Sequence, residues 1–184
     1  MKILLSGGGT LGPVTPLLAL VEHWRSHDEH VDLLWAGTKT GPEASLIEEY
    51  DIQFVPIESV KAPRYASFYW LAAPYKFVRA FWYARQLLKE ERPDIIVTAG
   101  GYVSVPLVIW GRFMKIRSWV HQQDVLPGMS NKIMARFATH ISVTFDASRS
   151  AFAASKSEVT GNAVRPSMLA AKRDVSVEHF ELDP

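Results

Sequence analysis

The chain has 184 residues, which suits one domain or slightly more, and 48% of them are hydrophobic, enough for a substantial core. The formal net charge of +1 argues against wholesale nucleic-acid binding, and the lack of cysteine excludes disulfides and thiolate catalysis. No signal peptide is evident, and no uncharged apolar run approaches the roughly 20 residues that a membrane-spanning helix needs.

Apolar segments of strand length alternate along the chain with longer segments of helical pattern. Strands are predicted over residues 2–6, 31–37, 52–57, 94–100, 117–122 and 140–145, and helices over 14–27, 41–50, 74–91, 104–114 and 128–138. Continuously apolar strands suit a parallel sheet buried on both faces. The alternation therefore predicts a doubly wound, mostly parallel, Rossmann-like α/β sheet, whose binding crevice lies at the carboxyl ends of the strands.

The stretch "SGGGTLGP", residues 6–13, follows the first predicted strand and leads into the first predicted helix. Its glycines Gly7, Gly9 and Gly12 satisfy the dinucleotide pattern G-x-G-x-x-G. That pattern expects an acidic residue near the end of the second strand, and "WAGTKTG" offers none, which argues against NAD. Anion binding needs no such acid, because glycines let backbone N–H groups face a phosphate and the helix adds its positive dipole end.

A second glycine loop, "TAGGYVSVP", repeats this construction after the strand predicted at 94–100. Gly100 and Gly101 precede Tyr102 and Ser104, and a helix is predicted to follow. Two such loops at one sheet edge could hold a diphosphate between two helix N-termini. The alternative is that one of the two loops is only a turn.

The third feature, "HQQDVLPGMSNK", begins where the strand predicted at 117–122 ends. His121 closes that strand, and Gln122, Gln123 and Asp124 open the loop. A histidine near an aspartate is a possible acid–base pair. A histidine at a strand end equally often hydrogen-bonds a backbone group, and the sequence leaves both interpretations open.

The segment "YASFYWLAAPYKFVRAFWYARQLLK", residues 65–89, is unusually rich in aromatic and basic residues. The helical spacing of apolar residues at 77, 81, 84 and 88 predicts one buried face. The remaining aromatic residues lie among Lys and Arg, as at an interfacial membrane surface, although a missing domain or partner chain could cover them instead. We favour membrane contact through Tyr69, Trp70, Lys76, Arg79 and Trp82.

Five segments in this order, "SGGGTLGPVTPLLAL", "AGTKTGPEASLI", "TAGGYVSVP", "HQQDVLPGMSNKIMARFA" and "VTGNAVRP", resemble the MurG family of glycosyltransferases over about residues 1–170. The resemblance implies a GT-B fold, in which two Rossmann-like domains enclose the active site. Residues 1–163 would then be the N-terminal, membrane-associating acceptor domain. Residues 164–184 would be a linker and the start of a C-terminal donor domain, with a frayed tail as the alternative.

The family resemblance also implies a reaction and its partners. Members transfer N-acetylglucosamine with inversion from UDP-GlcNAc to lipid I, which forms lipid II in peptidoglycan synthesis. They work at the cytoplasmic face of the bacterial membrane, as peripheral proteins on anionic lipid. A donor domain would be needed in cis or in trans, so the 184 residues alone are expected to be inactive. No cofactor, metal or nucleic acid is implied.

Site residues carry over from the family motifs position by position. The acceptor diphosphate is assigned to Gly8, Gly9, Thr10, Gly100, Gly101, Tyr102 and Ser104. The donor UDP-GlcNAc is assigned to Thr10, Leu11, Gly12, Asp124 and Arg165.

The sequence departs from the family at two loops. Leu11 and Pro13 replace the glycine and histidine of G-G-T-G-G-H-x-x-P. In the H-E-Q-N motif the acid and the amide have exchanged places, which gives Gln122 and Asp124. We therefore expect Asp124, together with His121, to serve at the reaction centre. The altered loops leave open a non-catalytic or split-enzyme module that holds a polyprenyl-diphosphate sugar, and an enzyme with another acceptor sugar.

Overall fold

The computed structural model describes residues 1–27, 30–57 and 69–169, and within them the strands form one sheet. The strands are β1 (Lys2–Ser6), β2 (Asp32–Thr38), β3 (Gln53–Ile57), β4 (Ile95–Thr98), β5 (Arg117–Gln122), β6 (His140–Val143) and β7 (Ser157–Val159). Their order is β3-β2-β1-β4-β5-β6-β7, and every neighbouring pair is parallel. The predicted doubly wound α/β sheet is confirmed.

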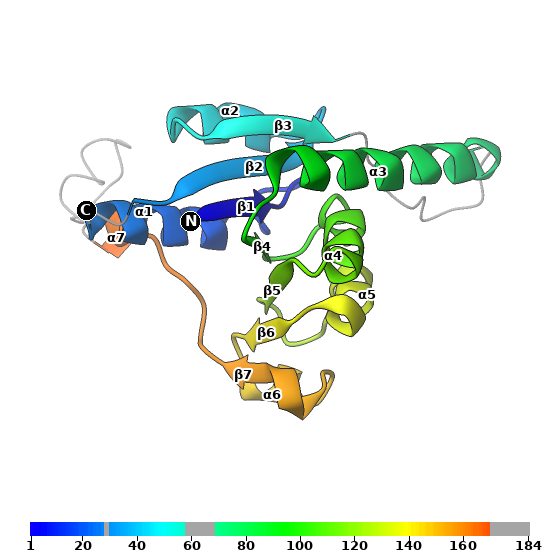
Figure 1. Cartoon of the computed structure of the whole chain (residues 1–184). Helices are drawn as coiled ribbons and strands as arrows, with labels where there is room; N and C mark the ends of the chain where they lie inside the picture. The colour runs from blue at the N-terminus through cyan, green and yellow to red at the C-terminus, as the bar shows by residue number, and fades with distance from the viewer. Residues whose placement is uncertain (28–29, 58–68, 170–184) are drawn as a thin grey trace, which may run out of the picture.

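Helices connect the strands on both faces of this sheet (Figure 1). They are α1 (Thr15–Ser26), α2 (Glu43–Glu49), α3 (Tyr69–Glu91), α4 (Ser104–Phe113), α5 (Met129–Phe137), α6 (Asp146–Arg149), α7 (Pro166–Leu169) and the 3-10 turn Ala154–Lys156. Helix α3 begins at Tyr69 and not near Pro74, although proline is common in the first turn of a helix. It extends past the end of the sheet (Figure 1). Strand β7 was not predicted, because its three residues include two exposed ones and form no apolar run.

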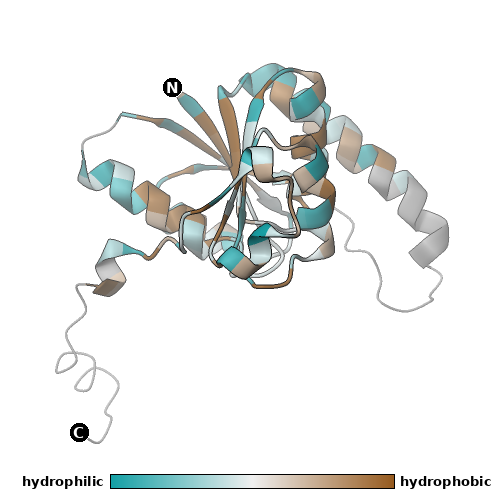
Figure 2. Cartoon of the chain, turned by 90° about the horizontal axis from the view of Figure 1, so that it is seen from below, coloured by the Kyte–Doolittle hydropathy of each residue, from teal (hydrophilic) through white to brown (hydrophobic). Residues whose placement is uncertain are grey.

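Two hydrophobic layers hold the helices against the sheet, as the apolar strands in Figure 2 indicate. In β1, Ile3 and Leu5 pack with Leu17 and Leu18 of α1. Leu4 points to the opposite face, among apolar residues of α3, α4 and α5. Burial of both faces provides the main favourable term for folding, and it requires the continuous apolar strands that the sequence shows.

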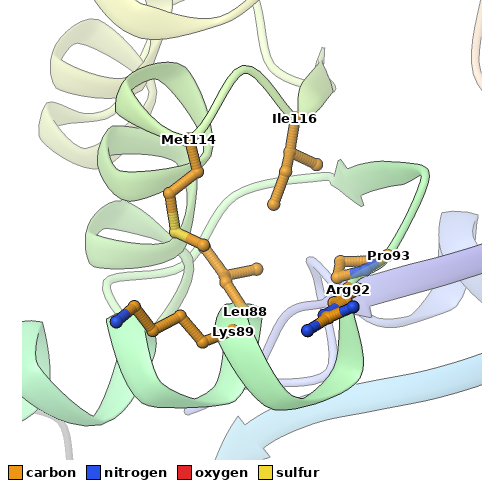
Figure 3. A pocket seen from close by; sticks show the side chains of 6 residues that line it. All are labelled: Leu88, Lys89, Arg92, Pro93, Met114 and Ile116. Atoms are coloured by element: carbon orange, nitrogen blue, oxygen red, sulfur yellow. The ribbon is translucent and has the colours of Figure 1, made fainter.

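The direction of the strands decides where a site can form. Because all seven strands are parallel, the loops after β1, β4 and β5 meet at one edge of the sheet. A cavity of about 430 Å³ between the ends of α3 and α4 lies at the opposite edge, beside the residues that lead into β4 and β5 (Figure 3). That cavity is therefore remote from the predicted glycine loops.

After β7 the chain crosses to α1, where α7 makes contact (Figure 1). Residues 170–184, predicted as part of a linker and the start of a second domain, lie outside the described residues.

Candidate functional site

The three predicted loops converge on one cavity at the carboxyl edge of the sheet. Its volume is about 370 Å³, and its described lining residues are Thr10, Gly12, Pro13, Ala99, Gly101, Gln122, Gln123, Asp124, Gly128, Met129, Ser130 and Asn131. The structure thus brings together four of the residues assigned from sequence, namely Thr10, Gly12, Gly101 and Asp124. Of the described lining residues, Asp124 is the one with an ionisable side chain.

A single side-chain amide connects the three loops. Nε2 of Gln123 donates to the Gly12 carbonyl at 3.0 Å and lies 3.5 Å from the Ala99 carbonyl. Gln123 belongs to the third loop, Gly12 to the first and Ala99 to the second. Sequence analysis did not identify this role, because the two acceptors are backbone atoms 111 and 24 residues away.

The glycines of the first two loops permit close contact between those loops. Gly9 has φ +81°, and a Cβ added there would lie 2.7 Å from the ring of Tyr102. A Cβ added to Gly101, at φ +95°, would lie 3.2 Å from the Gly8 carbonyl oxygen. Side chains at these positions would force the loops apart, so glycine is required for their packing before any ligand is considered.

The start of α1 offers few backbone donors. The N–H groups of Val14 and Thr15 both donate to the Leu11 carbonyl, at 3.0 and 3.1 Å. Pro13 and Pro16 have no N–H. Residues 13–16 therefore give an anion the helix dipole but no direct N–H contact. The side chain of Leu11 is 42% exposed and does not line the cavity.

Ser104 lies beneath the second loop and not at the cavity. Its side chain is fully buried, and its hydroxyl lies 2.9 Å from the hydroxyl of Ser6 and 3.0 Å from that of Thr98. It also donates to the Gly100 carbonyl at 3.2 Å. These contacts join β1 to β4, and they hold the Ser104 hydroxyl inside the protein beneath the second loop.

The exchanged acid and amide of the third loop occupy different environments. Gln122 is buried; its Nε2 donates to the Asp124 carbonyl at 2.7 Å, and its Oε1 accepts from Nδ2 of Asn131 at 2.7 Å. Ser148 donates to the same Asp124 carbonyl at 3.1 Å. Two donors thus fix the backbone of Asp124 while its side chain stays exposed at the cavity. A glutamate at position 122 would have no N–H group to donate to the Asp124 carbonyl.

His121 is not among the residues that line the cavity, and it belongs to a separate network. Its Nδ1 lies 2.8 Å from the Ser142 hydroxyl, which accepts from the indole N–H of Trp119 at 2.8 Å. Its Nε2 lies 3.2 Å from Oδ1 of Asn162, in the segment after β7. Burial lowers the pKa of His121, although the hydrogen bond to Asn162 acts in the opposite direction. His121 and Asp124 form no acid–base pair here, and the partners of the His121 ring are side chains.

Arg165 also lies away from the cavity. Its Nη1 donates to the Tyr50 hydroxyl at 3.3 Å, and that hydroxyl donates to Glu22 at 2.7 Å. Glu22 is seven residues into α1, about 10 Å along the helix from its start at the cavity. Burial raises the pKa of Tyr50, as does the bond to Glu22. Arg165, in the segment between β7 and α7, is therefore linked to α1 through Tyr50, the residue that follows α2.

Helix α3 presents aromatic and basic residues outward. The side chains of Tyr69, Trp70 and Lys76 lie outside the described residues. Trp82 is 58% exposed, and the guanidinium of Arg79 lies 5.7 Å from the ring centroids of its neighbours Tyr75 and Tyr83. Of the positions predicted to form the buried face, 84 and 88 are buried and 81 is half-buried, whereas the side chain at 77 lies outside the described residues. None of the described helices has the length and apolar character required to cross a membrane.

The chain is similar in sequence to a known protein family and to named transferases. The glycosyltransferase family 28 N-terminal domain matches residues 3–143. A UDP-N-acetylglucosamine--N-acetylmuramyl-(pentapeptide) pyrophosphoryl-undecaprenol N-acetylglucosamine transferase of Lactiplantibacillus plantarum is 33% identical over 184 residues, which is 100% of this chain and 51% of the relative. The transferase of that name from Desulfitobacterium hafniense is 36% identical over 167 residues, 90% of this chain and 45% of its own length.

A solved structure is also similar to this chain. The crystal structure of Acinetobacter baumannii MurG superposes with a TM-score of 0.72 at 25% identity, over 94% of this chain and 47% of that one. The chain thus spans about half the length of the curated relatives it matches.

Replacing His121 with asparagine should flatten the pH dependence of stability. Because burial lowers the pKa of His121 in the folded chain, the unfolded chain binds the proton more tightly. The free energy of unfolding of the native chain should therefore fall as the pH decreases from about 7 to about 5. The measurement is urea unfolding at intervals of pH. His30→Asn, at an exposed histidine, should keep the native slope, and a native slope in His121→Asn would contradict the assignment.

Proposed function

Because the chain belongs to the glycosyltransferase family 28 N-terminal domain family, we propose that it is the acceptor half of an N-acetylglucosamine transferase. The donor would be UDP-GlcNAc and the acceptor lipid I, so that the product is lipid II. The names of the relatives support this substrate pair. The observation that carries the proposal is the convergence of three loops on one cavity whose ionisable lining residue, within the described chain, is Asp124.

The proposed reaction is a direct displacement with inversion. The acceptor hydroxyl attacks the anomeric carbon of the donor sugar, and a C–O bond forms as the bond to the diphosphate breaks. UDP leaves with the electron pair of that bond. A base must take the hydroxyl proton, and Asp124 is our candidate, because its carboxylate is exposed at the cavity while its backbone is held by Gln122 and Ser148.

The loops must supply the groups that stabilise the negative charge of the acceptor diphosphate. Thr10, Gly12, Gly100 and Gly101 are the best placed of the residues assigned from sequence, since three of them line the cavity and the fourth adjoins it. Preorganised donors in such loops stabilise charge without rearrangement. To contact the UDP-GlcNAc donor, the guanidinium of Arg165 would have to break its hydrogen bond to the Tyr50 hydroxyl.

The remainder of the donor site would come from a second domain. The relatives are about twice as long as this chain, which supports a C-terminal donor domain supplied in cis or in trans. Residues 1–163 would be the acceptor domain, and residues 164–184 the linker and the start of the donor domain.

In the enzyme reassembled with a donor domain, Asp124→Asn should lower kcat by about 10²–10⁴, the usual contribution of a general base. The assay is transfer of radiolabelled GlcNAc from UDP-GlcNAc to lipid I. Asp146→Asn, at an exposed aspartate in α6, is the matched control and should leave kcat unchanged. The 184 residues alone should show no turnover. Full activity of Asp124→Asn would exclude Asp124 as the base.

We further propose that the outer face of α3 and the end of α4 rest on the cytoplasmic face of the cell membrane. Tyr75, Val78 and Trp82 are exposed on α3, and Phe113 is 67% exposed at the end of α4. Arg85 lies 5.5 Å from the ring centroid of Trp110, which links the two helices. Aromatic rings flanked by cations suit the headgroup region of an anionic bilayer.

Co-sedimentation with vesicles of phosphatidylglycerol and phosphatidylcholine tests this surface. Trp82→Ala and Arg79→Gln should each lower the bound fraction, the first through lost apolar burial and the second through lost attraction to anionic lipid. Phe145→Ala, at an exposed aromatic residue beside α6, should bind as the native chain does. Lack of binding at low salt by the native chain would point to a protein partner on this face.

A further inference from the structure

The side chain of Glu43 lies directly beneath the first glycine loop, outside the residues that line the cavity. Glu43 is the first residue of α2, and it is fully buried. Its Oε1 accepts from the backbone N–H and the hydroxyl of Thr38, both at 2.6 Å. The N–H of Gly9 lies 3.2 Å from both carboxylate oxygens. A carboxylate without water is expensive to bury, and these three donors are what stabilises it here.

The carboxylate also occupies space that side chains would otherwise need. A Cβ added to Gly8 would collide with Oε1 of Glu43, and a Cβ added to Gly41 would collide with Oε2. Glycine at both positions therefore leaves room for the Glu43 carboxylate where its three donors hold it. A loop with a glycine at positive φ forms a concavity of N–H groups that binds an anion, and here Glu43 itself supplies an anion to the Gly9 amide.

We infer that Glu43 is a positioning residue of the candidate site. Its carboxylate holds the Gly9 amide toward the protein interior and so fixes the turn from which Thr10 and Gly12 reach the cavity. The Gly9 amide is then not available to a substrate phosphate, and the other loop residues must bind it. The effect on acceptor binding rests on the proposed function, whereas the effect on the loop does not.

The charge of Glu43 and its hydrogen bonds predict opposite effects of Glu43→Gln on acceptor binding. The charge of Glu43 has the same sign as a diphosphate, so its removal alone would strengthen anion binding. Thr38 provides two donors to Oε1, and the glutamine oxygen must stay there. The amide N–H₂ then replaces Oε2, so the N–H of Gly9 keeps one of its two acceptors and faces a donor in place of the other. The positioning role therefore predicts a loosened loop and weaker acceptor binding.

Amide hydrogen exchange of the 184-residue chain, followed by NMR, measures the loop directly. In Glu43→Gln the Gly9 amide should exchange about tenfold faster relative to the Leu5 amide of β1, which corrects for any loss of global stability. Glu49→Gln, at an exposed position on the same helix, removes the same charge and should leave the Gly9 rate unchanged. An unchanged ratio in Glu43→Gln would overturn the inference.

A double-mutant cycle gives an independent measurement if Glu43→Gln folds poorly. Gly8→Ala should destabilise the native chain because of its collision with Glu43. Glu43→Asp withdraws the carboxylate by one methylene, so Gly8→Ala should cost less in that background. Equal costs in the two backgrounds, measured by urea unfolding, would contradict the contact.

The reassembled transferase separates this inference from the proposed function. Glu43→Gln should raise KM for lipid I at least about tenfold with a smaller change in kcat, because the loop and not the base is altered. Glu49→Gln should match the native enzyme. A native enzyme without activity would refute the proposed function and leave the exchange result standing, whereas an active enzyme with unchanged KM in Glu43→Gln would refute the positioning role.

Discussion

All seven strands of the sheet run in the same direction, so their carboxyl ends lie at one edge, where the chain must turn into a helix or cross the sheet. The loops after β1, β4 and β5 come from adjacent strands and therefore meet there. The cavity, the exposed Asp124 and the contacts between the loops all follow from this geometry. The opposite edge receives the helix ends, and the described residues there form no glycine loop.

Polar side chains, of which Glu43 and Gln122 are buried and Gln123 is half-buried, give these loops their shape. Glu43 lies beneath the first loop, Gln122 within the third, and Gln123 between all three. In a low-dielectric interior an unsatisfied donor or acceptor costs more than a satisfied one gains, so each group permits few backbone arrangements. The glycines make room for these contacts, as the close approach of Tyr102 to Gly9 illustrates.

The departures from the family motifs are consistent with this interior. At the third loop the amide of Gln122 is buried and the carboxylate of Asp124 is exposed, an order that keeps a charge out of the protein interior. At the first loop, Pro13 removes an N–H from the start of α1, and the Leu11 carbonyl accepts hydrogen bonds from the next two N–H groups, those of Val14 and Thr15. The helix start is thereby satisfied without a ligand, and the phosphate contacts must come from other loop residues.

The sequence by itself determined the alternation of strands and helices, and β5 has the bounds that were predicted, because periodicity is a local property of the chain. It also placed Thr10, Gly12, Gly101 and Asp124 at strand ends, which parallel topology brings together. Only the tertiary structure decided which partners the polar side chains have. The pairs Glu43–Gly9, Gln123–Gly12, His121–Asn162 and Arg165–Tyr50 are separated by 34 to 115 residues. Such contacts depend on how the helices pack across the sheet, and no local pattern encodes them.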